Sequence, residues 1–232
     1  MLVLGLLSGC NTVQTELVLQ PVQLGTKTQA RADRVGACFG LDRSVIQPSH
    51  LALDASQLGA GYENVFIRGA DPAPCNLRRN YSHQGAIQFD LSEVTRRHAT
   101  VIEAVLDYDV TPGFRTEGAD DIVFLNLSTQ PWTNGNFFGP LNVADNRTQL
   151  TVAPMPRTDD RTLEPLRFLG GHFRPVITQT VRQWLHQGRP YLDNNGIVLA
   201  TAPAHSFAED NSSSITLVTN IRLRLKLLEP AP

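Results

Sequence analysis

Regular alternation between apolar and polar side chains is the feature that most constrains this chain. In its last run, apolar and basic residues take turns: Ile221, Arg222, Leu223, Arg224, Leu225, Lys226 and Leu227. Successive side chains of a strand point to opposite faces of a sheet. The run therefore predicts a half-buried strand, with its apolar residues inward and its basic residues outward.

Shorter runs of the same kind recur over residues 86–91, 102–110 and 123–127. In the second of these, alternation predicts one core-facing set: Ile102, Ala104, Leu106, Tyr108 and Val110. Residues 196–200 are apolar throughout, which predicts a strand buried on both faces. A single short α-helix is expected over about 176–187, where apolar residues recur at helical spacing.

Many strands, one helix, 17 glycines and 15 prolines favour an all-β fold. A parallel α/β architecture needs helices between most of its strands, and the sequence predicts only one. We therefore expect an antiparallel β-sandwich that occupies residues 45–228 as one domain.

The first ten residues indicate the compartment. Residues 1–9 are almost entirely apolar, and Leu7-Ser8-Gly9-Cys10 resembles the lipobox of bacterial lipoproteins. The resemblance implies a signal peptide over 1–9, acylation of Cys10, and a lipidated tether and edge segment over 10–44. No Lys or Arg precedes the apolar stretch, which indicates a start codon placed too late or a degenerate segment. The alternative is an ordinary buried strand with an incidental cysteine.

In this resemblance, Asn11 after the cysteine favours the outer membrane of the bacterial cell envelope, with the lipid bilayer as a partner through acylated Cys10. Outside the cytoplasm thiols tend to oxidise, so Cys38 and Cys75 are candidates for a disulfide. Their bond closes a loop of about 37 residues and contributes roughly 4 kcal/mol in the chain-entropy model. Two unpaired thiols are the alternative.

Several segments in order resemble the DNRLRE and CBM96-like domains of secreted proteins. Gly85-Ala86-Ile87-Gln88-Phe89-Asp90-Leu91-Ser92 and the run at 99–106 are similar to the family's "RFDLS…A.V..A.L" core. Residues 178–185 resemble its "DVT..V..W" segment, and 194–199 its "N.G..L" segment. The resemblance implies a jelly-roll topology and a carbohydrate-binding role. The family's Arg before Phe and Asp before Val-Thr are absent here, which weakens any imported binding site.

Composition and motifs exclude several classes of function. Twenty basic and 22 acidic residues give a net charge of −2, without the basic excess of nucleic-acid-binding proteins. The chain contains no Gly-x-Ser-x-Gly elbow, no His-Glu-x-x-His motif and no glycine-rich phosphate loop before a helix. His205, Ser206 and Asp210 are triad types, but one loop does not align them for catalysis. We expect no catalytic residues, no enzyme activity and no required cofactor.

Residues 130–139 are the first ligand-binding candidate. Three aromatic rings and two amides are expected to contact a sugar: Trp132, Phe137, Phe138, Asn134 and Asn136. The alternative is that Trp132 plugs the sandwich and Asn-Gly-Asn is a turn. The acidic pairs Asp120-Asp121 and Asp159-Asp160 are candidates for Ca²⁺ ligation, with solvated loops as the alternative.

A basic ladder of Arg222, Arg224 and Lys226 on the last strand is the second candidate. Its cations suit an acidic polysaccharide or lipopolysaccharide phosphates. The alternative is a solvated face paired with acids of a neighbouring strand, such as Glu103, Asp107 and Asp109. The sequence thus predicts a non-catalytic envelope lipoprotein that binds polysaccharide, or else a structural lipoprotein that docks an envelope protein without binding glycan.

Overall fold

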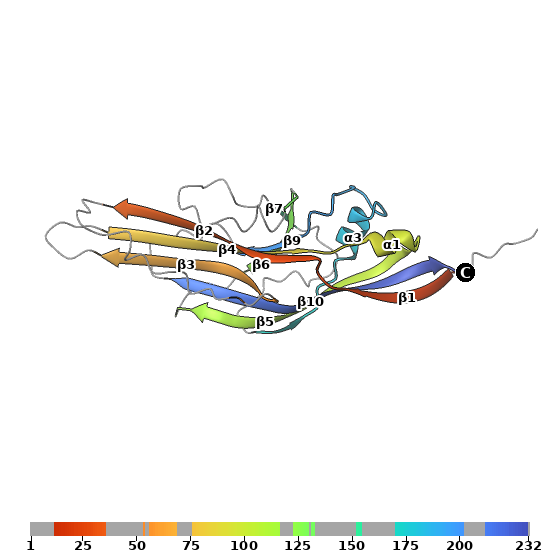
Figure 1. Ribbon diagram of the computed structural model, residues 1–232, viewed down its shortest axis with the longest axis horizontal. Coiled ribbons are helices and arrows are strands. Elements are labelled where there is room, and N and C mark those ends of the chain that lie inside the picture. Colours follow the sequence, from red (N-terminus) through yellow and green to blue (C-terminus); the bar gives the residue numbers. More distant parts are fainter. Residues whose placement is uncertain are drawn as a thin grey trace, which may run out of the picture.

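The architecture is all-β and antiparallel, as predicted. In a computed structural model of the chain, the described residues are 12–35, 53, 56–68, 76–116, 123–129, 131–132, 152–154, 170–201 and 212–231. Their strands form one curled sheet (Figure 1). The strands are β1 (Thr12–Leu19), β2 (Gln23–Val35), β3 (Leu58–Arg68), β4 (Asn76–Gln88), β5 (Thr100–Arg115), β6 (Val123–Ser128), β7 (Val152–Pro154), β8 (Gly171–Phe173), β9 (Ile197–Thr201) and β10 (Ser213–Pro230). The helices are α1 (Ser92–Arg96) and α3 (Thr178–Trp184).

The sheet divides into two layers because one edge of β4, and likewise one edge of β10, pairs with two different strands along its length. β3 lies between them, pairing with β4 over residues 76–83 and with β10 over 213–218. Beyond β3, β9 takes over the edge of β4 and β1 takes over the edge of β10. Two layers result, β2-β4-β9-β6-β7 and β1-β10-β5-β8. The jelly-roll topology that the family resemblance implies stays a prediction.

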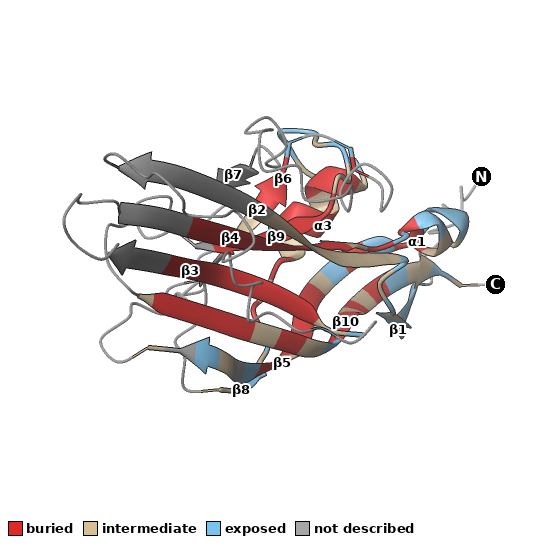
Figure 2. Ribbon diagram, turned by 60° about the vertical axis from the view of Figure 1, so that its left-hand side comes forward, coloured by how far each residue is buried: buried red, intermediate tan, exposed pale blue. Residues whose placement is uncertain are grey.

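The hydrophobic core lies between these two layers. One cluster joins Ile87 and Leu199 of one layer to Leu106 and Leu223 of the other, all at most 1% exposed. Figure 2 shows buried residues along β3, β4, β5 and α3. The alternation predicted for the last strand is confirmed, since every second residue from 221 to 227 is buried.

Helix α3 is shorter than the range predicted for it. It spans seven residues, and His186 just beyond it has φ +58°, which ends the helical path. The helix is fixed on β5 by polar contacts. Thr178 Oγ1 accepts a hydrogen bond from the Ala104 amide at 2.9 Å, and Arg182 Nε donates to the Val101 carbonyl at 2.7 Å.

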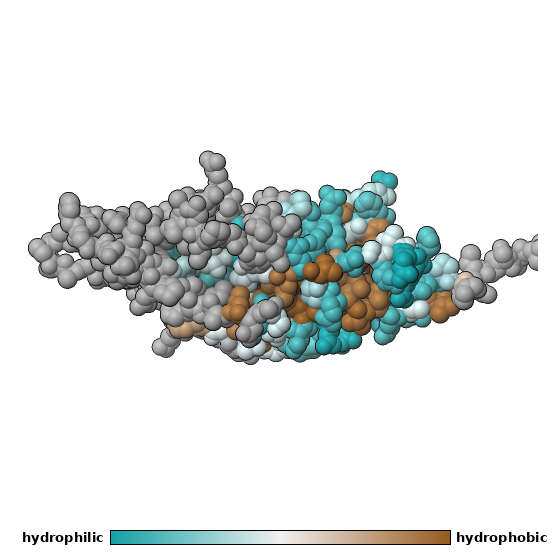
Figure 3. Space-filling view, in the orientation of Figure 1, coloured by the Kyte–Doolittle hydropathy of each residue, from teal (hydrophilic) through white to brown (hydrophobic). Residues whose placement is uncertain are grey.

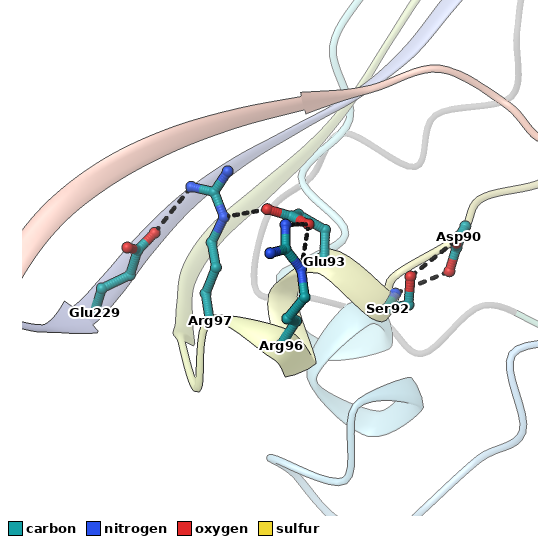
Figure 4. Close-up of polar contacts among 6 residues, drawn as sticks. All are labelled: Asp90, Ser92, Glu93, Arg96, Arg97 and Glu229. Atoms are coloured by element: carbon teal, nitrogen blue, oxygen red, sulfur yellow. Dashed lines mark hydrogen bonds and ion pairs between the residues drawn. The ribbon is translucent and has the colours of Figure 1, made fainter.

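The sequence did not predict α1, because five residues are too few for a helical pattern. Charged side chains hold it against the end of β10 (Figure 4). Arg97 lies between Glu93, at 2.6 Å, and Glu229, at 3.2 Å. Thr15 of β1 also donates to Glu229, at 2.5 Å. This cluster ties β1, β10 and α1 together, and its hydrogen bonds from Arg96 and Arg97 lower the pKa of the Glu93 carboxyl.

Asp90 explains part of the segment that resembles the DNRLRE core. Its carboxylate accepts hydrogen bonds from the Ser92 amide and hydroxyl, both at 2.9 Å (Figure 4). These bonds fix the turn from β4 into α1. The motif therefore has a structural role at the strand end.

Strands occupy much of residues 10–44, the range that the sequence assigned to a lipidated tether and edge segment. Thr12–Leu19 pairs with β10 along its whole length, and Gln23–Val35 pairs with β4. Leu17, Leu19 and Leu24 pack against the core, which stabilises this segment within the sheet. The sheet therefore begins at residue 12 rather than at residue 45.

The alternation predicted across residues 102–110 is wrong at Ile102. The register skips this residue, because Glu103 pairs with Lys226 and Val101 with Leu227. Such a bulge adds one residue and reverses which side chains face inward. Val101 is therefore buried, whereas Ile102 is 40% exposed.

Two leucines of β10 test the placement of the core. Leu225→Ala should lower the free energy of unfolding by roughly 2–5 kcal/mol, because Leu225 is 1% exposed and truncation leaves a cavity. Leu228→Ala, at a position 37% exposed, is the matched control and should cost far less. Chemical denaturation of both variants measures the difference. Equal losses would contradict the inward placement of Leu225.

Candidate binding site

An open hollow on the outer face of the sheet is lined entirely by polar and charged side chains. Its volume is about 440 Å³, and it is lined by residues of β5, β10 and the segment around β8: Asp107, Asp109, His172, Arg174, Asn220, Arg222 and Arg224. Side chains that face away from the core at these strands meet there. The hollow is thus a product of strand pairing rather than of one loop.

A bulge in β10 shapes the hollow. Thr219 pairs with Asp109 and Arg222 with Asp107, so Asn220 and Ile221 together face one residue of β5. Asn220 takes φ +53°, a left-handed conformation that asparagine tolerates better than most residues. The bulge brings its amide within 2.6 Å of the Asp109 carboxylate.

His172 connects the two carboxylates of the hollow. It lies opposite Asp109 in the pairing of β5 with β8. Its Nδ1 is 2.7 Å from Asp109 Oδ1, and its Nε2 is 3.2 Å from Asp107 Oδ1. Both ring nitrogens donate only in the imidazolium form. Hydrogen bonds from Asn220 and then His172 hold the pKa of the Asp109 carboxyl below its usual range.

Asp107 is covered by cationic side chains, although it faces outward. Its Oδ2 accepts a hydrogen bond from Arg224 Nε at 2.5 Å, and Arg174 Nε lies 4.0 Å away. The aspartate side chain is 6% exposed, whereas that of Arg174 is 58% exposed. A buried carboxylate is stabilised by such partners. Both acids of the hollow are therefore already engaged.

The three residues of the predicted basic ladder have different roles: Arg224 and Lys226 form ion pairs, whereas Arg222 lines the hollow without one among the described residues. Lys226 lies outside the hollow and forms an ion pair with Glu103 at 2.8 Å, which raises the pKa of Lys226. Arg224 pairs with Asp107. For these two residues the structure shows the paired alternative. Arg222 is exposed and, within the described part of the chain, forms no hydrogen bond or ion pair.

Trp132 is a packing residue rather than an exposed sugar platform. It is 4% exposed and lies in a small apolar cluster with Ala86, Val198 and Ala200. Its indole Nε1 donates to the Asn195 carbonyl at 2.8 Å. Gly196 fits this site because it has φ +88°, and an added Cβ would lie 2.3 Å from the Ile87 carbonyl oxygen. The position of Trp132 is therefore that of the alternative prediction, in which its side chain fills the interior of the sandwich.

The remaining predicted site residues lie outside the described residues. These are Cys10, Cys38, Cys75, Asp120, Asp121, Asn134, Asn136, Phe137, Phe138, Asp159 and Asp160. Acylation, the disulfide and Ca²⁺ binding stay predictions. Within the described ranges, no group of three or more His, Cys, Asp or Glu side chains is arranged to hold a metal ion.

A buried polar cluster joins β2, β3 and β4. His83 Nδ1 lies 2.8 Å from Thr28 Oγ1, and His83 Nε2 lies 3.0 Å from Glu63 Oε1. These are the residue types of a hydrolytic triad. The histidine is 0% exposed and the glutamate 1%, so both groups are shielded from solvent, whereas Thr28 is half-buried. The cluster satisfies polar groups that the sheet buries and links three strands.

Sequence reasoning missed three residues of the hollow. His172, Arg174 and Asn220 lie outside any recognised motif, and their partners are distant along the chain. The bulge that carries Asn220 gave no clear signal in the sequence, because Leu217, Thr219 and Ile221 continue the period of two through it.

Comparisons with protein-family models, with curated proteins and with solved structures found no match for this chain. The resemblance to the DNRLRE and CBM96-like family therefore stays a prediction.

Neither helix in the described ranges has the length and apolar character needed to cross a membrane.

The polar contacts of the hollow predict an acidic titration of Asp109. In Asn220→Gly, the left-handed backbone is kept and the amide donor is lost, so the pKa of Asp109 should rise toward its ordinary value. Since the native pKa is depressed, the stabilisation from ionised Asp109 is present at neutral pH and is lost as pH falls through the folded pKa. Carboxyl ¹³C NMR titration measures the shift. Ser92→Ala is the control, and an unchanged pKa in Asn220→Gly would refute the assigned contact.

Proposed function

We propose that this chain is a non-catalytic binding module of the bacterial cell envelope, and that its outer hollow holds a surface polysaccharide. The observation that carries the proposal is the convergence of seven polar side chains from three separate chain segments on one open concavity. Sugars present hydroxyl groups that amide, carboxylate and guanidinium groups recognise by hydrogen bonds.

The rigid setting of the hollow supports a role in binding. β5 and β10 pair from Ser214 to Leu228 and form much of the core, so they hold their outer side chains at fixed spacing. A prearranged site loses less side-chain freedom when it takes a ligand. The seven lining residues include no serine, threonine or cysteine nucleophile, which fits binding better than acyl transfer.

Attachment to the envelope is a further part of the proposal. The lipobox resemblance places an acyl group on Cys10, and β1 begins only two residues later. Thr12 pairs with Pro230. A lipid anchor at Cys10 would then hold this end of the sheet near the bilayer, most consistently in the outer membrane, and two or more acyl chains would make attachment stable.

Mapping by NMR tests the site. Envelope polysaccharide fragments titrated into ¹⁵N-labelled protein should shift amide signals at residues 107–109, 171–174 and 220–224. Strand β2, which pairs with β4 and not with β10, serves as the internal reference and should show little change. Fragments that produce no shifts, or shifts confined to residues away from the hollow, would contradict the proposed polysaccharide site.

The alternative is a structural lipoprotein that docks an envelope protein, and the edge of β1 favours it. Among the described strands, only β10 pairs with β1. Val13 is 46% exposed, Val18 is 45% exposed and Val22 just after the strand is 64% exposed. Figure 3 shows hydrophobic surface gathered over the region where β1 meets β10. An open edge strand with exposed valines is a template for strand addition.

Site-specific cross-linking distinguishes the two functions. A photoreactive residue in place of Gln14, on the exposed part of β1, should give one discrete protein adduct in intact cells if this edge docks a partner. The same residue in place of Thr95, exposed on α1, is the control. If neither position yields an adduct, the docking alternative fails.

A further inference from the structure

The lining of the hollow points to a particular class of polysaccharide, an inference that rests on the proposed binding function. Neutral sugars usually gain affinity by placing their CH faces against aromatic rings. Apart from the imidazole of His172, the seven lining side chains contain no aromatic ring and no purely aliphatic group. Affinity at this surface must therefore come mainly from charge and hydrogen bonds.

The carboxylates of the hollow do not offset all of its cations. Three arginines line it against two aspartates, so the net charge is +1 with neutral His172 and +2 with its imidazolium form. Asp109 is held by Asn220 at 2.6 Å and His172 at 2.7 Å, while Asp107 is held by Arg224 at 2.5 Å. These contacts engage both acids, and Arg222 acts on Asp109 through its charge alone, so a surplus of positive charge remains on Arg222 and Arg174.

Arg222 and Arg174 carry that surplus. Arg222 has no hydrogen bond or ion pair among the described residues, and Arg174 has only its 4.0 Å approach to Asp107. A guanidinium is planar and presents paired donors that match the two oxygens of a carboxylate or sulfate. The chain as a whole has a net charge of −2, so this local excess is not a general property of the protein.

We propose that the hollow recognises acidic sugars, with Arg222 and Arg174 binding the oxyanion that the sugar carries. Asp107 and Asp109 act as positioning residues, since their contacts fix Arg224, Asn220 and His172 around the ligand. The remaining hydroxyls of the sugar then meet the amide group of Asn220. Discrimination between acidic and neutral chains arises because a neutral sugar leaves both guanidinium groups without a counter-charge.

Calorimetric titration with matched ligands tests this inference. The probes are hexagalacturonate, its full methyl ester, a sulfated hexasaccharide and inorganic sulfate. At least one acidic oligosaccharide should bind at the hollow, and the methyl ester should bind about ten-fold more weakly or worse. Inorganic sulfate should bind more weakly than the acidic oligosaccharide, because it makes none of the sugar contacts. Affinity for the acidic ligand should fall as salt rises, since the attraction is screened.

Variants of β10 provide the matched comparison. Arg222→Gln should weaken the acidic oligosaccharide about ten-fold or more, because it removes a charged hydrogen-bond donor. Arg222→Lys should give an intermediate loss, because it keeps the charge but not the paired donors. Lys226→Gln removes one positive charge from the same face of the same strand, outside the hollow, and should have little effect.

The outcomes distinguish the acidic-sugar inference from the polysaccharide site on which it rests. Equal binding of hexagalacturonate and its ester, mapped to the hollow, would overturn the acidic-sugar inference while leaving the polysaccharide site in place. Binding of inorganic sulfate without either acidic oligosaccharide would overturn the inference and the polysaccharide function together. Equal losses in Arg222→Gln and Lys226→Gln would also overturn it, because they indicate a diffuse charge effect.

Discussion

The pairing of β10 with β5 is the interaction on which the rest of the structure depends. β10 is 18 residues long and lies beside β5 from Ser214 to Leu228. The other edge of β10 pairs first with β3 and then with β1. Through β3, β10 is joined to the layer that contains β4, while its second half belongs to the layer that contains β1 and β5. The core, the outer charges and the place of β1 all follow from the register of this pair.

Bulges decide which residues this pair turns inward. In β10 the buried positions change from Val218 to Ile221, and in β5 they change from Val101 to Ala104. Both changes span three residues, and both coincide with a shift of register. Without the bulge, side chains would keep a strict period of two, and the buried residues on one side of the register shift would point to solvent. The extra residue restores the core, and in β10 it also supplies Asn220 to the hollow.

The sequence predicted the elements whose information is local. Alternation over 221–227 specifies a strand buried on one face, and the continuous apolar run at 196–200 specifies a strand buried on both faces. Sheet order was beyond that reasoning, since β1 pairs with residues more than 200 positions away. Trp132 shows the same limit for a site: an aromatic beside Asn and Gly fits a sugar platform or a core plug, and only the packing of Ala86 and Val198 distinguishes them.

The basic ladder shows how identical residue types acquire different roles on one strand. Lys226 meets Glu103 across the sheet, and their charges cancel. Arg222 pairs in register with Asp107, yet the carboxylate bonds to Arg224 instead. This diagonal contact uses the acid that Arg222 would otherwise bind. The guanidinium of Arg222, which has no hydrogen bond or ion pair among the described residues, thus owes its place to geometry that neither charge count nor spacing contains. The same geometry divides a ladder that is uniformly basic in sequence into paired cations and a cationic site.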